Sequence, residues 1–292
     1  MNPEWLRYFA MLAETRNFHA AAERLHITPQ ALSKAIAGLE TNLKVKLVDR
    51  GHRVEGLTGA GEALLEETRI VLQSLENAER RIAEWRQGTP QGPVTIAGDG
   101  LWHHYLLPTL LADLIRAHPL VRPKLYEMLA ADAESRVANG EVEIGLLLEA
   151  PQRQDVDWFA GMSSSYVIAG RPGPTRPWQD CQYIVPRFFR KETSESLDGW
   201  PEGKFKRRIV AEVELLETAI HLCEAGVGEA FIPELAIRER IARGSLAIIA
   251  EAPCAFADQL YVIWRKGIRP SLAMKEVLDR LRQNDPSGRD DA

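Results

Sequence analysis

Apolar residues recur at helical spacing in three short stretches at the start of the chain, over residues 3–15, 18–25 and 28–42. The third stretch opens with Thr28-Pro29. Threonine caps helices well, and proline suits the first helical position because it has no N–H to leave unpaired. About three residues separate the second stretch from the third. The pattern therefore predicts a helix-turn-helix, which consists of two short helices joined by such a turn.

The third predicted helix carries few charges on the side that its apolar residues leave free. Gln30, Ser33 and Lys34 lie on that side. Glutamine can pair with adenine, and lysine can reach guanine or a phosphate, so this surface fits a DNA major groove. The alternative is a three-helix bundle whose exterior is merely polar. The pattern favours DNA binding.

A short hairpin is predicted after the third helix, with strands over residues 46–50 and 54–57. Its tip carries positive charge, which suits contact with phosphates or the minor groove. The residues expected to bind DNA are Thr28, Pro29, Gln30, Ser33, Lys34, Arg50 and Arg53.

A long helix is predicted over residues 58–88, and its apolar positions alternate in steps of four and three. We call these positions the heptad seam: Leu64, Thr68, Val71, Leu75, Ala78, Ile82 and Trp85. Such a seam predicts pairing with a second copy of the chain, and all its members except Thr68 are expected to form the dimer. The alternative is a single helix lying on its own domain. The run from Gly88 to Pro93 ends the helix and predicts a hinge.

Strand and helix patterns alternate through the rest of the chain. Strands are predicted at 94–98, 122–128, 143–148, 164–170, 182–186, 246–249 and 260–267. Helical patterns lie between most of them, and a closing amphipathic helix follows the last. This order predicts an α/β domain.

The first 60 residues resemble the winged helix-turn-helix of LysR-type transcriptional regulators. The resemblance rests on the paired alanines at 21–22, Leu25 before the turn, the Ala-Leu-Ser of 31–33, Leu39-Glu40, the Leu-x-x-Arg of 47–50 and the Leu-Thr-x-x-Gly of 57–61. Lys44 and Val48 stand where the family usually has glycine and phenylalanine. The resemblance implies a DNA-binding dimer, and often a tetramer, with a pseudo-palindromic double-stranded operator.

The body resembles the effector-binding domain of the same family, most clearly at "NGEVEIGLL" and "LCEAGVGEAFIP". The resemblance implies an α+β protein with three parts: a winged helix-turn-helix over 1–60, a linker helix and hinge over 61–92, and a periplasmic-binding-protein-like effector domain over 93–292. Lobe one is expected over 93–161 plus 258–285, and lobe two over 162–257. It also implies a small-molecule effector between the lobes, and RNA polymerase is a further partner to consider.

Ligands of open α/β sheets bind beyond the carboxyl ends of the strands, which directs attention to the loops there. Asp99 in such a loop disfavours a simple carboxylate effector, and Trp102 suggests a flat or apolar group. The residues expected to bind the effector are Asp99, Gly100, Leu101, Trp102, His103, Met128, Ser163, Ser164, Ser165, Arg187, Gly226 and Val227.

Composition and charge exclude several other classes. The net charge is −5, but residues 1–60 carry +2, which suits a DNA-binding head on an acidic body. No apolar run approaches a membrane span, and the N-terminus lacks the order of a signal peptide, so a cytoplasmic protein is expected. We find no nucleophile elbow, P-loop or dinucleotide fingerprint, so we expect no enzyme activity, no cofactor and no metal.

Two other functions remain open at this point. One is a cytosolic small-molecule-binding protein whose head only mediates assembly. The other is a regulator triggered by oxidation of Cys181 and Cys223. Three widely spaced cysteines do not suggest a disulfide framework, and free buried thiols are the simpler expectation.

Overall fold

The computed structural model describes residues 2–50, 54–186 and 198–283. The head contains α1 (Pro3–Thr15), α2 (Phe18–Arg24) and α3 (Pro29–Leu43), followed by an antiparallel hairpin of β1 (Val48–Arg50) and β2 (Val54–Leu57). Asn2, Asn17 and Thr28 cap the three helices through their side-chain oxygens. The helices enclose a core built around Phe9, Leu32 and Ile36. The predicted helix-turn-helix and hairpin are therefore present.

The contacts of two side chains, Glu40 and Thr58, explain why the hairpin follows α3 so closely. The buried Glu40 carboxylate accepts a hydrogen bond from the Leu47 backbone N–H at 3.0 Å. Thr58 caps the next helix by accepting from the Gly61 N–H, and its hydroxyl donates to the Lys46 carbonyl at 2.7 Å. A Cβ on Gly61 would collide with the Leu47 carbonyl, so this position needs glycine. The Leu39-Glu40 and Leu57-Thr58-x-x-Gly61 motifs thus hold the wing against the head.

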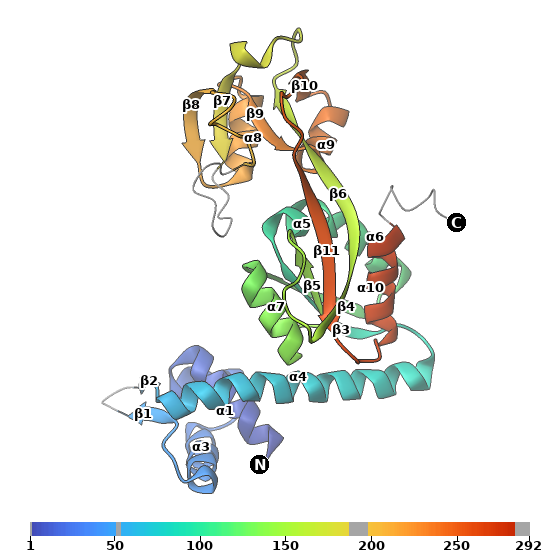
Figure 1. The fold of residues 1–292 in the computed structure, drawn as a ribbon. Helices are drawn as coiled ribbons and strands as arrows, with labels where there is room; N and C mark the ends of the chain where they lie inside the picture. The colour runs from blue at the N-terminus through green and yellow to red at the C-terminus, as the bar shows by residue number, and fades with distance from the viewer. Residues whose placement is uncertain (1, 51–53, 187–197, 284–292) are drawn as a thin grey trace.

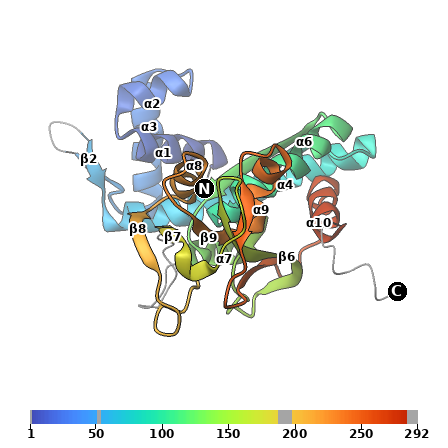
Figure 2. The same ribbon diagram turned by 90° about the horizontal axis from the view of Figure 1, so that it is seen from above.

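A single helix of 29 residues, α4 (Gly59–Gln87), joins the head to the body. In Figure 1 it runs beneath the body, with the head at its N-terminal end. Gly88 ends it with a left-handed backbone, φ 67°. Seen from above, the wing and α10 lie on opposite sides of the molecule (Figure 2).

Lobe one is built around the end of the mixed sheet that lies nearer α4 (Figure 1). It contains β3 (Gly92–Gly98), α5 (Gly100–Tyr105), α6 (Leu107–Ala117), β4 (Val121–Glu127), α7 (Ala130–Asn139), β5 (Ile144–Leu147) and α10 (Leu272–Gln283). Strand β3 is parallel to both β4 and β5, whereas β11 (Ala257–Arg265) is antiparallel to β5. The strand order is β10-β6-β11-β5-β3-β4, with β9 also paired to β6.

Lobe two is connected to lobe one through two long antiparallel strands, β6 (Val156–Gly170) and β11, which extend from one lobe to the other (Figure 1). It adds the 3-10 turn η1 (Trp178–Asp180), β7 (Gln182–Pro186), β8 (Arg208–Val213), α8 (Leu216–Glu224), β9 (Ala230–Pro233), α9 (Glu234–Ala242) and β10 (Ala247–Ala250). Strands β7 and β8 form a separate parallel pair.

The sequence pattern missed the first half of β6 and the whole of β8. The expected strand over 164–170 is only the second half of a strand of 15 residues. Exposed and buried positions alternate irregularly along β6, and β8 is mostly exposed, so neither shows a clean period of two. No helix in the described parts of the chain is long and apolar enough to cross a membrane.

Candidate nucleic-acid interface and effector cleft

The exposed side of α3 offers small polar groups in a row. Gln30, Lys34, Ala37 and Thr41 are exposed at positions i, i+4, i+7 and i+11, while Ser33 is half-buried beside them. The Thr28 side chain accepts from the Ala31 N–H at 3.2 Å and so fixes the start of the helix. This side carries few charges and several hydrogen-bonding groups, which suits a helix that approaches base edges.

Two special positions set the orientation of α3. A Cβ on Gly38 would lie 2.6 Å from the Trp5 ring, so this glycine allows α1 and α3 to pack closely. Lys44, at the position where glycine was expected, adopts the left-handed conformation with φ 57°. The helix therefore ends as glycine would end it, at a strain cost of about 1 kcal/mol. Val48, in place of phenylalanine, is the first residue of β1 and is buried in the core of the head.

The wing positions expected to contact phosphate are only partly described. Arg50 ends β1 and pairs in register with Val54. Arg53 lies outside the described residues.

The heptad seam on α4 is divided in two. Leu64 packs against the core of the head, and Thr68 is buried. Farther along, Val71 and Ala78 are exposed and Leu75 is half-buried, while Ile82 is 63% exposed and Trp85 is 84% exposed. The second half of the seam thus forms an uncovered apolar strip on one chain. Leu64 was expected to contribute to the dimer, but within its own chain it already contacts the head.

The opposite side of α4 is polar and lies on lobe one. Arg80 and Glu84 are buried there, although both side chains are charged. Arg80 pairs with Glu143, just before β5, and Glu84 accepts from backbone N–H groups at the start of α10. The two interpretations of this helix, a partner seam and a helix lying on its own domain, therefore apply to different sides.

The carboxyl ends of the lobe-one strands meet at one edge, at Gly98, Glu127 and Leu147. Asp99 follows at this edge and caps α5, its carboxylate accepting from the Leu101 N–H at 2.8 Å. The Asp99 carboxylate therefore occupies one of the backbone donors that an anionic ligand would use at this helix start. Gly100 lies under Glu127, since a Cβ there would come within 2.7 Å of that carboxylate.

Two expected effector residues belong to the protein core. Trp102 has no exposed surface and Leu101 is only 7% exposed, and both pack among the residues of the main cluster. A flat effector therefore has no exposed Trp102 ring on which to stack, contrary to the sequence-based expectation. His103 is partly buried, and burial lowers its pKa.

The three serines of β6 differ in what they can offer. Ser164 is buried, and its hydroxyl accepts from the Leu235 N–H at 3.1 Å, which caps the first turn of α9. Ser163 and Ser165 alternate with it and are exposed. Ser164 therefore has a structural role, and its two neighbours are available to a ligand.

The remaining expected effector residues are dispersed. Met128 follows β4 and packs beside α7. Gly226 lies at the far end of α8, next to Arg171, which follows the end of β6. The start of α8 faces lobe one, so a helix of nine residues separates Gly226 and Val227 from the contact between Tyr105 and Glu217. Arg187 lies outside the described residues.

A bridge between the lobes was missed from the sequence. The Tyr105 hydroxyl on α5 donates to Glu217 on α8 at 2.6 Å, and the Arg240 guanidinium on α9 donates to the other Glu217 oxygen at 2.7 Å. Burial, followed by the Glu217 carboxylate, raises the pKa of Tyr105, so it remains a donor. Tyr105 and Glu217 are 112 positions apart, and no local pattern marks them as partners.

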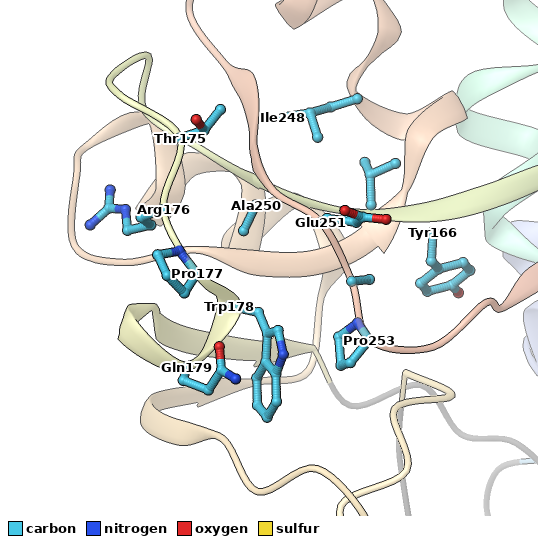
Figure 3. Close-up of a pocket in the computed structure, with 12 residues that line it drawn as sticks. Tyr166, Thr175, Arg176, Pro177, Trp178, Gln179, Ile248, Ala250, Glu251 and Pro253 are labelled. Carbon is cyan, nitrogen blue, oxygen red and sulfur yellow. The ribbon is translucent and has the colours of Figure 1, made fainter.

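A separate hollow of about 1210 Å³ opens on lobe two (Figure 3). It lies between the segment at 175–179 and the chain that follows β10, with Trp178, Pro177 and Pro253 among its walls. Arg176 at its rim pairs with Glu229 at 3.1 Å. None of the described residues expected to bind the effector lines this hollow, so it is distinct from the sheet edge beside α5.

Comparison with known families decides the class of protein. Residues 3–62 match the model described as "Bacterial regulatory helix-turn-helix protein, lysR family", and residues 87–286 match the "LysR substrate binding domain". The chain belongs to the LysR family of transcriptional regulators. Members of this family are regulators and not enzymes, which confirms the expectation of no catalytic activity.

Named relatives of this LysR-family chain cover most of its length. It is 25% identical over 276 residues to the regulator YxjO of Bacillus subtilis, covering 91% of this chain and 93% of the relative. It is 28% identical over 240 residues to the regulator ClcR of Pseudomonas putida, covering 78% and 81%.

Solved structures of the family have the same fold. The LysR-family regulator CbnR aligns with a TM-score of 0.70 at 22% identity, covering 97% of this chain and 99% of that one. A full-length variant of OxyR from Pseudomonas aeruginosa gives a TM-score of 0.66 at 20% identity, covering 97% and 98%. These likenesses confirm the α+β fold with a helix-turn-helix head and a mixed-sheet effector domain.

Proposed function

We propose that this LysR-family regulator binds a pseudo-palindromic operator as a dimer and changes its DNA binding when a small-molecule effector occupies the cleft between its lobes. We assign these functions to three parts of the chain: a winged helix-turn-helix over 1–60, a dimerising linker over 61–92 and an effector domain over 93–292. The site of action is the cytoplasm, where the DNA is accessible, and RNA polymerase is the further partner that a regulator of transcription would affect.

The observation that carries the proposal is the exposed side of α3. Gln30 and Lys34 are exposed one helical turn apart at the N-terminal end, which is the end that enters the major groove in this motif. Ser33, half-buried between them, can donate or accept close to a base edge. We assign base reading to Gln30 and Ser33, and phosphate contact to Thr28, Lys34, Arg50 and Arg53. Pro29 positions the first turn.

Exposed apolar side chains support self-association. Ile82 and Trp85 bury little surface in one chain, and a contiguous apolar strip on a surface marks an interaction site. We assign the dimer contact to Val71, Leu75, Ala78, Ile82 and Trp85. A second set of exposed apolar residues lies on the edge strands β4 and β8, and it suits a dimer of dimers: Leu125, Tyr126, Ile209 and Val210.

The effector site that we propose lies between α5 and lobe two. Asp99 and Gly100 form its floor at the carboxyl edge of the lobe-one sheet, and Met128, Ser163 and Ser165 are its remaining described walls. His103 is a neutral contact near physiological pH because burial lowers its pKa. The Tyr105–Glu217 bridge crosses the same gap, so an effector that changes the separation of the lobes must keep or break it.

Selection of binding sites from a library of random duplexes tests the proposal. We expect enrichment of an inverted-repeat sequence, and affinity that falls by about a thousandfold between roughly 50 and 200 mM salt if about six phosphates are contacted. Gln30→Ala should relax the preference for the selected sequence by about 1–3 kcal/mol and weaken binding to random DNA less. Glu66→Ala, on the exposed side of α4, is the control. Equal losses on both DNAs would contradict the assignment of Gln30.

One alternative function predicts a different result in the same assay. A small-molecule-binding protein whose head only mediates assembly would show no enrichment at moderate salt. A thermal-shift screen with small acids, amines and aromatic compounds would still detect its ligand, because binding to the folded state raises the unfolding temperature.

The cysteine-triggered alternative is disfavoured by the environment of the thiols. Cys181 and Cys223 are buried, and burial raises the pKa of Cys181 and raises that of Cys223 to about 12. Because the thiolate is the reactive form, both thiols are poor targets for oxidants. We expect peroxide treatment to have the same effect on DNA binding by the double variant Cys181→Ser/Cys223→Ser as on DNA binding by the wild type.

A further inference from the structure

A hollow of about 240 Å³ lies between α4 and the adjoining end of lobe one. Its walls come from three segments: α4 at 74–81, the turn between α7 and β5 at 140–143, and the chain from the end of β11 to the start of α10 at 265–274. The volume is slightly below the roughly 300 Å³ of the smallest typical ligand pockets, so the hollow suits a small molecule.

The walls of this hollow are strongly basic. Among the described residues that line it, Glu143 alone is acidic, whereas four are arginines: Arg80, Arg81, Arg265 and Arg269. We call these five residues the arginine hollow. Four positive charges against one negative charge favour an anionic ligand.

The single carboxylate of the arginine hollow is already engaged. Glu143 is buried, and its two oxygens bind the guanidinium of the buried Arg80. One of these oxygens also accepts from the Thr95 N–H at 3.2 Å. Glu143 therefore neutralises Arg80, and three arginines remain.

These three arginines, Arg81, Arg265 and Arg269, are exposed, and in the described parts of the chain no carboxylate lies within ion-pair distance of them. Asp155 is near enough to Arg265 to sense its charge. However, the pKa of Asp155 is lowered first by its hydrogen bond with Arg153, and the two form an ion pair at 2.7 Å. Like charges around one hollow repel each other, and an anion between them removes that repulsion.

The position of the Arg265 guanidinium depends on a glycine. Gly140 ends α7 with φ 82°, and a Cβ at this position would lie 3.1 Å from Arg265 Nη1. Glycine therefore allows the guanidinium to lie against the turn that forms one wall of the hollow.

The neutral polar side chains of the hollow also offer donors. The Asn77 Oδ1 atom accepts from Gln73 and from Arg80, which leaves the Asn77 amide N–H groups for a ligand. Ser271 is 5% exposed, and its Oγ accepts from the Met274 N–H at 3.1 Å, so its hydroxyl proton can be donated. The acceptors are thus occupied while donors remain, as an oxyanion requires.

We propose that the arginine hollow binds a small phosphate dianion, either inorganic phosphate or the phosphate group of a small ester. Guanidinium groups bind phosphate oxygens in pairs, which makes arginine the usual residue for this group. Val142, Ile268 and Met274 also line the hollow and would contact the organic part of an ester.

The bound phosphate would contact two parts of the chain, because Arg81 belongs to α4 whereas Arg265 and Arg269 belong to lobe one. Phosphate therefore favours the arrangement in which α4 lies on lobe one. The site itself does not depend on the proposed function, but any effect of phosphate on the DNA-binding heads rests on it.

Isothermal titration calorimetry on the full-length protein, without DNA, tests the site. The titration is done in chloride buffer of constant ionic strength at about pH 8, where a phosphate ester is a dianion because its second pKa is about 6. We expect saturable binding of inorganic phosphate or of glycerol phosphate. Tighter binding of glycerol phosphate would assign the site to an ester, and equal or weaker binding would assign it to free phosphate. No saturable binding of either compound would overturn the proposal.

Variants locate the bound phosphate. Arg81→Met and Arg269→Met should each weaken binding by about tenfold or more, because each removes charged hydrogen bonds to the ligand. Arg86→Met is the matched control, since Arg86 is exposed on α4 outside the hollow. Lys34→Ala tests whether phosphate binds on the DNA-binding surface instead. Both controls should bind phosphate as the wild type does.

Two results with these variants would overturn the site. One is phosphate binding that is unchanged in both Arg81→Met and Arg269→Met. The other is a loss in Lys34→Ala as large as theirs. Circular dichroism checks that each variant is folded, and Arg265→Met takes the place of one that is not. Selection of an operator by a protein that fails to bind phosphate would contradict this site and leave the proposed function intact.

Discussion

The two sides of α4 differ in which kind of side chain they bury. The apolar side, ending at Ile82 and Trp85, is exposed, and the polar side, with Arg80 and Glu84, is buried on lobe one. A surface helix of a monomer normally shows the reverse. Buried charges are tolerated because Glu143 and the start of α10 satisfy them, whereas the exposed apolar side has no such compensation within the described part of one chain. The comparison indicates that the polar side packs on lobe one of its own chain and that the apolar side packs against a second copy.

The largest expected effect comes from the apolar side. Leu75→Lys should leave the protein folded but monomeric, because it places a charge in the middle of the exposed strip. Loss of the second head removes the gain from simultaneous binding, so operator affinity should fall by about 10²–10⁴-fold. Light scattering after gel filtration and fluorescence anisotropy measure the two effects.

Glu79→Lys is the control for this change, since it alters charge on an exposed position of α4 outside the heptad seam. It should leave the mass of the oligomer unchanged. A Leu75→Lys protein that elutes with the wild-type mass would show that the apolar side is not the dimer contact.

The next effect comes from the polar side. Arg80→Ala leaves the Glu143 carboxylate buried without its partner, which should lower the free energy of unfolding by about 3–5 kcal/mol. The double variant Arg80→Met/Glu143→Leu removes both charges and should recover most of that loss. Urea unfolding measures both. A single variant as stable as wild type would mean that this side is not buried in solution.

The smallest effect concerns the helix start that Glu84 caps. Glu84→Ala removes the acceptor for two N–H groups of α10 and should lower the free energy of unfolding by about 1 kcal/mol. Hydrogen exchange should speed up at Leu272 and Ala273 before it does so elsewhere in α10. Unchanged exchange at these two amides would rule out the cap.

Local patterns were enough to predict the head and the seam. Thr28-Pro29 marks the start of α3 through groups within three residues, and the seam repeats along one helix. The contact between Arg80 and Glu143 could not be predicted, because the two residues are 63 positions apart.

The candidate effector site was predicted less well, for a similar reason. The location beyond β3 followed from the sheet, but the exposure of each side chain depends on packing between distant segments. Trp102 is buried by the main core cluster, and Gly226 lies at the far end of α8. The Tyr105–Glu217–Arg240 bridge joins three helices and has no local signal at all.

Footprinting on the selected operator tests the central claim, that two copies joined through α4 each place an α3 in the major groove. Hydroxyl-radical cleavage is compared for the wild type and for Leu75→Lys at equal occupancy. We predict two protected half-sites about one helical turn, or a multiple of it, apart for the wild type, and a single half-site for the variant. A single protected patch with the wild type, or two half-sites with the monomeric variant, would contradict the account.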